Sequence, residues 1–347
     1  MTTSSPSSAS TGRSVGTTRN VTVSPGSRPA GEGATFFQIF VEGVGLGALY
    51  ALVAMGFALI YKVTSVLNFA QGEIALVGAY GVVFLGTGAV IDQLRVPAVV
   101  AVVGTVAIGV LLGILLERVV FKQFIGEPVL SVIIITLALG GIFGGFVQFL
   151  FGRNFRAYPE PLLFDRNVGL PLGASIPAAY AIAVLISLAV VAALMLFFRY
   201  TVTGSILRAA ASDEQAAMVL GVSIERTIAV AWALSIGVTA VGGMLLAMSS
   251  GGAGFSIETT GIIIFAAVVF GGLDSIPGAF VGALVVGLLE ELGSYYFEGG
   301  TAIVAPLIDV TLNFGAGFGQ ILPLIFLLVV IIVKPYGLFG TERIERL

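Results

Sequence analysis

The sequence predicts an all-α, polytopic integral membrane protein, a bundle of about eight to ten transmembrane helices with Gly-rich broken or re-entrant segments. Three observations predict this fold. Hydrophobic residues make up 57% of the 347 residues and the mean hydropathy is +1.08, more apolar side chain than a soluble domain of this length can bury. Apolar runs recur without the alternation of a barrel strand. The 47 glycines, with Gly-xxx-Gly spacings such as Gly43/Gly47, favour close helix packing in a bilayer.

The apolar runs are the expected transmembrane helices, because a helix needs roughly 20 mostly apolar residues to cross a bilayer. They cover residues 36–61, 70–91, 96–116, 129–151, 177–198, 228–248, 261–289 and 321–333. The run 261–289 is broken at 271–278. If this break reverses the chain, the chain crosses the membrane nine times. If 261–289 crosses the membrane only once, Lys334 and Arg343 lie outside. We expect a cytoplasmic C-terminus, which a re-entrant segment at a Gly-rich break would restore.

The two ends of the chain differ from the membrane domain, which we assign to residues 35–340. Residues 1–34 are rich in Ser, Thr, Gly and Pro and contain no apolar h-region. They are therefore not a secretory signal peptide and are expected to form a disordered tail. Residues 341–347 are expected to form a cytoplasmic C-terminal end.

Lysine and arginine residues indicate how the bundle is oriented in a cell membrane. If the charged segment 203–227 is cytoplasmic, nine basic residues share its side: Lys62, Arg118, Lys122, Arg199, Arg208, Arg226, Lys334, Arg343 and Arg346. Four lie on the other side: Arg95, Arg153, Arg156 and Arg166. The positive-inside rule predicts this excess for the cytoplasmic side. The same orientation places Glu258 among the acidic residues on the external side of the membrane.

Missing residue types exclude several functions. The chain has no Cys and no His, which removes disulfides, zinc sites and other His-based metal or haem sites, and His-based catalysis. A net charge of −3 gives no basic footprint for nucleic acid. No Gly-Lys dipeptide occurs, so the chain lacks a phosphate-binding loop, and any ATP must be bound by partner subunits. We expect a transporter rather than an enzyme, with no cofactor or metal in this chain.

The segment 203–227 is a polar interruption between two apolar runs. In a chain with only 10% charged residues it contains Arg208, Asp213, Glu214, Glu225 and Arg226. Its Ala-rich start predicts a helix with Thr203 or Ser205 as N-cap. Gly221 offers a stop, and Ser223 offers a cap for whatever follows. The segment is either a docking surface for a partner or a solvated loop.

Two polar breaks, at residues 64–73 and 271–278, interrupt otherwise apolar sequence, one in each half of the chain. Broken helices in corresponding halves indicate a transport path, because freed backbone groups and helix ends can meet a polar solute. The alternative is an ordinary loop at the membrane face. The candidate path residues are Asn68, Gln71, Glu73, Asp274 and Ser275.

Glu73 is followed at once by apolar residues, and an acid at that depth in a membrane is costly. It therefore needs a role, and three roles are open. It is a proton or cation site of a transporter, or it caps the N-terminus of the following helix, where the helix dipole favours an acid. In the third reading it hydrogen-bonds Asn68 or Gln71 and fixes the break.

Four segments, in this order, carry a family likeness: GLGALYALVAMGFALIYKVTSVLNFAQGEIALVGAY, GSILRAAASDEQAAMVLGVSIERT, VVFGGLDSIPGAFVGALVVGLLE and VVIIVKPYGLFG. Together they resemble the membrane permease subunits of bacterial and archaeal ABC importers for branched-chain amino acids, the LivH-type permeases. The resemblance covers residues 36–340, and its most distinctive motifs are the NFAxGE element at 68–73 and the GSIPGA-like element at 274–279. The stretch 293–319 and the tail 1–34 depart from the family pattern by their length.

The resemblance implies partners and residue roles. The partners are two cytoplasmic ABC ATPase subunits, a second related permease and an external solute-binding protein that delivers branched-chain or related small amino acids. Residues 203–227 would be a coupling helix region that docks on an ATPase, with motif positions Gly204, Arg208, Ala209, Ala211, Asp213, Ala217 and Gly221.

Two alternatives stay open. Urea or short amides are an alternative cargo, because their permeases resemble these. The other alternative is a secondary transporter or channel that works without ATPases, with Glu73 as its coupling acid.

Overall fold

The computed structural model describes residues 32–88, 96–124, 127–162, 167–298, 317–334 and 336–340. The predicted tail 1–34 lies outside these ranges except for its last residues, which begin the first helix. The predicted C-terminal end 341–347 lies outside them entirely. Both assignments therefore stay predictions.

Helices form nearly all of the described chain, which confirms the predicted all-α membrane bundle. The α-helices are α1 (Glu32–Thr64), α2 (Gln71–Gly86), α3 (Ala98–Val119), α4 (Val129–Phe151), α5 (Ala178–Tyr200), α6 (Val202–Ser212), α7 (Glu214–Val219), α8 (Ile224–Ser249), α9 (Ser256–Gly271), α10 (Ile276–Gly293) and α11 (Phe318–Val333). Shorter helical turns are η1 (Phe121–Phe124), η2 (Glu160–Leu162), η3 (Pro171–Gly173) and η4 (Ser294–Glu298).

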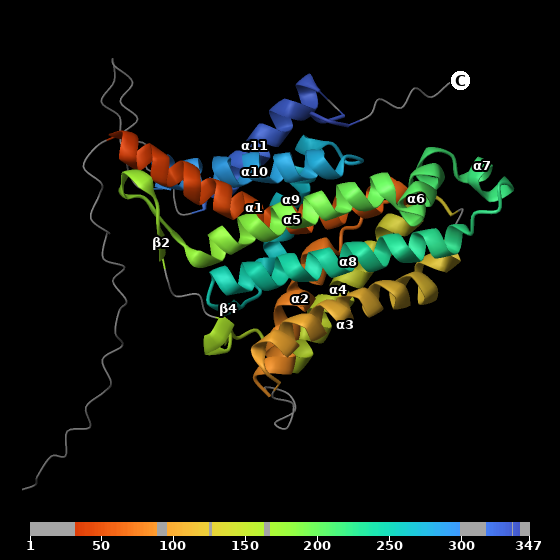
Figure 1. Cartoon of the computed structure of the whole chain (residues 1–347), viewed down its shortest axis with the longest axis horizontal. Helices are drawn as coiled ribbons and strands as arrows, with labels where there is room; N and C mark the ends of the chain where they lie inside the picture. The colour runs from red at the N-terminus through yellow and green to blue at the C-terminus, as the bar shows by residue number, and fades with distance from the viewer. Residues whose placement is uncertain are drawn as a thin grey trace, which may run out of the picture.

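Four short strands lie at one end of the bundle, where Figure 1 labels β2 and β4. They are β1 (Arg156–Ala157), β2 (Asn167–Gly169), β3 (Ser175–Pro177) and β4 (Gly252–Ala253). β1 pairs with β4 and β2 pairs with β3, both antiparallel. Next to β1, the Tyr158 hydroxyl donates to Ala79 O in α2 (2.7 Å), which ties this cap to the bundle.

The apolar runs predicted most of the helices. α4 begins and ends at the predicted residues, whereas α2 ends at Gly86 instead of residue 91. Among the described helices α1, α3, α4, α5, α8 and α10 are long and apolar enough to cross a membrane. α2, α9 and α11 have 16 residues each. Such a helix is about 24 Å long, less than the roughly 30 Å of a hydrocarbon core.

The predicted break at 271–278 reverses the chain. Gly282 of α10 faces Ala267 O, and Gly278 faces Gly271, so α9 and α10 pack antiparallel. Lys62 Nζ, at the end of α1, donates to Asp274 O in the turn between them (2.9 Å).

The described residues 336–340 return to the same turn, because Leu338 N donates to Phe270 O (2.8 Å) and Phe339 N to Gly271 O (3.0 Å). They therefore lie at the end of the bundle that carries Lys62, α6 and α7, which we call the α6 end (Figure 1).

α1 is the central helix of the bundle. Every residue from 47 to 60 is buried, and α5, α8, α9 and α10 pack around it. Within the described residues, 89% of its most apolar stretch is buried, against 28% for each of α3, α4 and α5. A helix that is apolar all round belongs inside a bundle, while the open outer faces of the other three suit lipid or a partner helix.

Gly43 and Gly47 let α1 approach α10 closely, as their spacing predicts. A Cβ on Gly47 would lie 2.6 Å from Leu284 Cα, and one on Gly43 would lie 2.8 Å from Leu288 Cα. Side chains at these positions would push the two backbones apart, so the glycines set the distance between the central helix and α10.

We predict that Gly47→Val destabilises the bundle, because overpacking a tight helix contact costs roughly 1–3 kcal/mol. Gly141→Val is the matched control, since a Cβ on Gly141 of α4 meets no atom within 4 Å. The midpoint of thermal unfolding in detergent should fall for Gly47→Val and stay unchanged for the control. Equal midpoints for both variants would contradict the close α1–α10 crossing.

Candidate functional site

The first polar break returns the chain into the bundle after α1. Ser65 has φ 55°, the single positive φ at a non-Gly position among the described residues, and it ends the helix. Phe69 N then donates to Thr136 Oγ1 in α4 (3.3 Å), and Gln71 Nε2 donates to Thr239 Oγ1 in α8. Both acceptors lie well inside their helices. α2 therefore begins partway along the bundle and not at its end.

Two buried amide side chains fix this break. Asn68 is 1% exposed and Gln71 is 3% exposed. Asn68 Nδ2 donates to Gln71 Oε1 (2.7 Å), and Asn68 Oδ1 accepts from Ala70 N (3.1 Å). Because buried polar groups need such partners, the break is a built part of the interior. This geometry does not fit an ordinary loop at the membrane face.

Glu73 lies in the first turn of α2, at the depth of the middle of α4. A Cβ on Gly140, the central residue of α4, would lie 3.1 Å from a carboxylate oxygen of Glu73. A glycine at this position leaves the room that the carboxylate occupies. The half-buried Glu73 is therefore an ionisable group near the middle of the bundle, the kind of position that is rare in membrane helices unless it serves a function.

Glu73 shares a cavity of about 260 Å³ with Glu258, in the first turn of α9. We call it the acidic cavity. It is lined by Asn68, Gln71, Gly72, Glu73, Glu258, Thr259 and Gly261, with Phe57, Phe69, Ile262 and Phe265 as apolar walls. Glu258 follows β4 at the end of the bundle opposite the α6 end, and its expected place on the external side stays a prediction. Glu73 is followed at once by apolar residues, whereas Thr259 and Thr260 separate Glu258 from the apolar run that begins at 261, so the signal for Glu258 was weaker.

The hydrogen bonds narrow the three readings of Glu73. Asn68 bonds Gln71 and the Ala70 N–H, and Gln71 also bonds Thr239. Neither amide bonds the Glu73 carboxylate. Glu73 is not the N-cap of α2, which is Ala70. Its position in the first turn is still one at which the helix dipole stabilises an acid. The shared cavity keeps the reading as a site for a proton or cation.

Asp274 and Ser275 lie elsewhere, at the α6 end. Ser275 is the N-cap of α10, and its Oγ accepts from Gly278 N (3.1 Å). Neither residue lines the acidic cavity. The structure thus brings together three of the five candidate path residues, Asn68, Gln71 and Glu73, and separates the other two from them.

The segment 203–227 forms two short helices, α6 and α7, at the α6 end (Figure 1). The predicted N-caps Thr203 and Ser205 are wrong: Thr201 is the N-cap, and its hydroxyl accepts from Gly204 N (2.9 Å). Thr201 also ends α5, so α6 follows directly, and a Cβ on Gly204 would lie 2.7 Å from Phe198 Cα. Gly221, with φ 85°, follows α7 as the predicted stop.

The seven motif positions of this segment divide between two faces. Gly204 and Ala217 are buried, and Ala211 is partly buried, so they hold the segment against the bundle. The exposed ones are Arg208, Ala209, Asp213 and Gly221.

Asp213 also has a structural role, because its side chain caps α7 by accepting from Ala216 N (2.9 Å). Val219 and Leu220, which no sequence motif singled out, are 87% and 83% exposed at the tip of α7.

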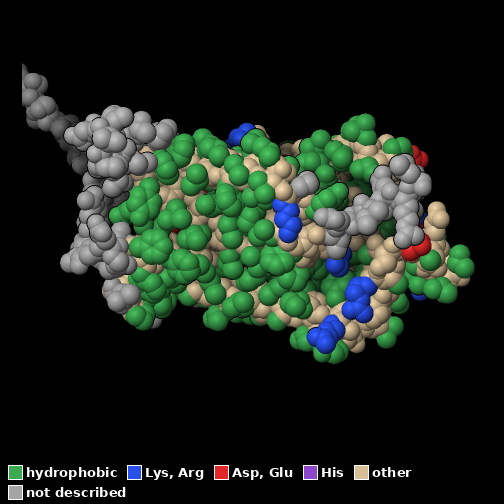
Figure 2. Space-filling view, turned by 90° about the horizontal axis from the view of Figure 1, so that it is seen from above, with side chains coloured by type: hydrophobic (Ala, Val, Ile, Leu, Met, Phe, Trp, Pro, Cys, Tyr) green, Lys and Arg blue, Asp and Glu red, His purple; other side chains and the backbone are tan. Residues whose placement is uncertain are grey.

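Basic side chains gather at the α6 end. The described residues of the predicted cytoplasmic set are Lys62, Arg118, Lys122, Arg199, Arg208, Arg226 and Lys334, and they lie on segments at this end. Figure 2 shows a broad hydrophobic face, with most of the Lys and Arg side chains in view toward that end. Lys122 pairs with Glu225 at the start of α8 (2.8 Å). Arg153 and Arg156 lie at the opposite end, while Arg95, Arg166, Arg343 and Arg346 fall outside the described residues.

Comparison with known proteins agrees with this architecture. A family model described as "Branched-chain amino acid transport system / permease component" matches residues 39–333. The high-affinity branched-chain amino acid transport permease LivH of Escherichia coli strain K12 is 29% identical over 318 residues, which cover 90% of this chain and 97% of that protein. The permease BraD of Pseudomonas aeruginosa is 26% identical over 321 residues, 90% of this chain and 98% of its own length.

A relative from an archaeon is similar as well. The probable branched-chain amino acid transport permease LivH of Methanocaldococcus jannaschii is 27% identical over 306 residues, 86% of this chain and 91% of that protein. No solved structure matches this chain.

Proposed function

The chain belongs to the family of permease components of branched-chain amino acid transport systems, and from this premise we propose that it is the transmembrane permease subunit of an ATP-driven ABC importer. Its cargo is a branched-chain or related small amino acid, delivered by an external solute-binding protein. The observation that carries the proposal is the match over residues 39–333.

ATP hydrolysis takes place on partner chains. The sequence has no phosphate-binding loop, so two cytoplasmic ATPase subunits bind the nucleotide. The α6 end is the cytoplasmic end, in keeping with its Lys and Arg residues, and the C-terminus is cytoplasmic with it.

α6 and α7 form the surface on which an ATPase docks. Arg208 and Ala209 present a charge beside a small side chain, and Val219 and Leu220 present an apolar tip. An exposed apolar tip rimmed by charge suits a groove on a partner, because apolar contacts supply affinity and charge-assisted hydrogen bonds orient it. The inner residues Leu207, Ala210 and Ala217 couple a shift of this surface to the bundle.

The acidic cavity is a polar site that the solute contacts on the transport path. Its two carboxylates suit the ammonium group of an amino acid, and Phe57, Phe69 and Phe265 suit an apolar side chain. Ile262, on its rim, is 64% exposed. A carboxylate that faces acyl chains is costly, so a second related permease covers this side and completes the path. An ammonium group gains more from the two acids than the neutral N–H groups of urea do, which favours an amino acid.

Reconstitution into liposomes with both ATPases, the second permease and the binding protein tests the function. Leucine uptake should require ATP hydrolysis and the binding protein. Leucine uptake by the permease without ATPases, driven by an ion gradient, would contradict the proposal and support the secondary-transporter alternative. ATP-driven uptake of urea but not of leucine would leave the ABC assembly intact and refute the cargo.

For docking, we predict that Leu220→Asp and Arg208→Glu each weaken ATPase binding by about tenfold or more, as loss of a contact worth about 1.4 kcal/mol does. Copurification of the ATPase measures this. Asp213→Asn should bind normally if Asp213 acts chiefly as the cap of α7. Phe155→Asp, an exposed apolar residue at the opposite end, is the control. Wild-type binding by both Leu220→Asp and Arg208→Glu would refute the docking surface.

For the path, we predict that Glu73→Gln and Glu258→Gln lower ATP-driven leucine uptake about tenfold or more, because an amide lacks the charge that attracts an ammonium group. Assembly with the ATPases should stay normal. Glu160→Gln, exposed at the opposite end, is the control. Unchanged uptake by both variants would reduce Glu73 to a partner of the helix dipole and remove the acidic cavity from the path.

A further inference from the structure

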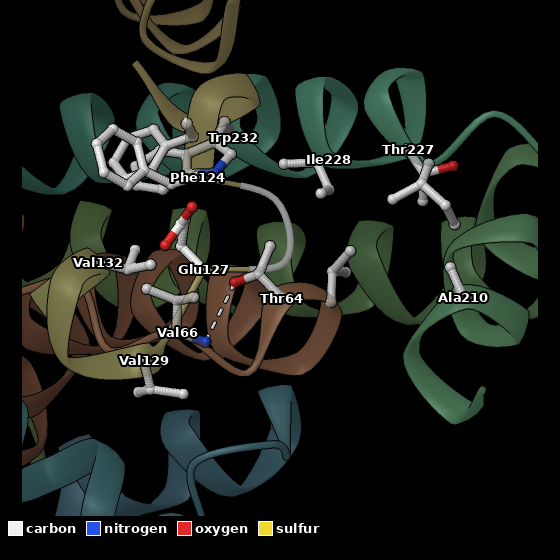
Figure 3. A pocket seen from close by; sticks show the side chains of 13 residues that line it. Thr64, Val66, Phe124, Glu127, Val129, Val132, Ala210, Thr227, Ile228 and Trp232 are labelled. Atoms are coloured by element: carbon white, nitrogen blue, oxygen red, sulfur yellow. Dashed lines mark hydrogen bonds between the residues drawn. The ribbon is translucent and has the colours of Figure 1, made fainter. Parts of the chain in front are cut away.

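A second cavity, of about 250 Å³, lies at the α6 end between the bundle and α6 (Figure 3). We call it the Trp232 pocket. Its walls come from the end of α1, the start of the first break, η1, the start of α4, α6 and the start of α8. It shares no lining residue with the acidic cavity. The proposed transport path does not use it.

The Trp232 pocket combines an apolar body with one acid. Trp232 stacks on Phe121 with ring centroids 3.9 Å apart and planes 18° apart, and this buried aromatic pair forms the back of one wall. Val132 and Ile228 add aliphatic surface. Glu127 is the one charged residue among the described residues that line it, and Figure 3 shows its carboxylate in the pocket, between Phe124 and Thr64. This is the chemistry that holds an ammonium group attached to an apolar body.

Two helix N-termini supply the opposite polarity. Val129 and Ile224, the first residues of α4 and α8, both line the pocket. Neither helix has a side-chain cap hydrogen bond. Ser131 N of α4 donates to Pro128 O (2.9 Å) and Thr227 N of α8 donates to Ser223 O (3.1 Å), whereas the N–H groups of Val129 and Ile224 come before the first intrahelical bonds, at helix ends that favour an anion. An acid, an apolar wall and these N–H groups together match a zwitterion with an aliphatic side chain.

We infer that the Trp232 pocket is a binding site for an aliphatic α-amino acid on the cytoplasmic side, where imported product acts back on the transporter. The side and the product rest on the proposed function. The pocket joins the proposed docking surface to the first polar break, because Ala210 belongs to the inner face of α6, and Thr64 and Val66 begin the break. A ligand that touches both favours the arrangement in which they fit it, and so slows the cycle.

The single tryptophan of the chain reports on the site directly, because Trp232 lines it. The full-length chain in lipid nanodiscs is titrated with leucine while Trp232 emission is recorded. We expect a saturable change in emission. Glu127→Gln should weaken apparent affinity about tenfold or more, and Val132→Phe, which fills the pocket, should abolish the response. Glu160→Gln at the opposite end is the matched control and should respond like the wild type.

Leucine analogues separate this ligand from a lipid chain. 3-Methylbutylamine lacks the carboxylate and 4-methylpentanoate lacks the ammonium group, and each should bind about tenfold more weakly than leucine. No saturable response to leucine, or an unchanged affinity in Glu127→Gln, would overturn the inference. Tighter binding of 4-methylpentanoate than of leucine would also overturn it and indicate an acyl-chain site.

The feedback role is tested by the initial rate of leucine uptake. This test can fail while the proposed transport function holds. In proteoliposomes that import leucine with ATP, leucine loaded on the ATPase side should slow the initial rate, and Glu127→Gln should relieve this inhibition with an unchanged uninhibited rate. Normal uptake without inhibition would overturn the feedback role alone. A Trp232 response that persists in Glu73→Gln and Glu258→Gln would show that the signal comes from this pocket and not from the acidic cavity.

Discussion

The hydrogen bonds that hold the chain inside the bundle after α1 are the constraint on which the rest of the structure depends. Asn68 and Gln71 bond each other, Gln71 Nε2 donates to Thr239 of α8, and Gly140 of α4 faces Glu73, so α2 starts beside the middle of α4. That start shortens α2 to 16 residues and carries Glu73 to mid-depth. Without these bonds, the buried amides would lack partners, and the break would be driven to the membrane surface.

α9 lines the other side of the acidic cavity and, like α2, is a short helix. The two short helices cross where Gly72 meets Gly261, and a Cβ on Gly261 would lie 2.8 Å from Gly72 Cα. Each helix carries one acid in its first turn, where the helix dipole offsets part of the cost of a carboxylate in an apolar bundle. The close crossing therefore accounts for the acidic cavity: two N-terminal turns meet, and both acids line the space between them.

Sequence patterns predicted what depends on local composition. The ends of α4, the break between α9 and α10 and the polar break at 64–73 follow from apolar runs and from Gly, Asp and Asn residues at fixed places. The pairing of Glu73 with Glu258 could not be predicted, because 185 positions separate them (258 − 73) and only the tertiary fold makes them neighbours. Asp213 shows another limit, since a charged residue that suits docking also caps α7.

The most direct test of the acidic cavity as the transport path uses the absence of cysteine from this chain. Thr259→Cys places a single thiol on the cavity, in the complete importer in a membrane. Its alkylation by a membrane-impermeant reagent is measured by mass spectrometry of this chain, with and without ATP and leucine-loaded binding protein. If the cavity is the transport path, the thiol reacts, ATP changes the rate of alkylation and leucine slows it. Reaction with a lipid-soluble reagent alone, at one rate in every state, would contradict it.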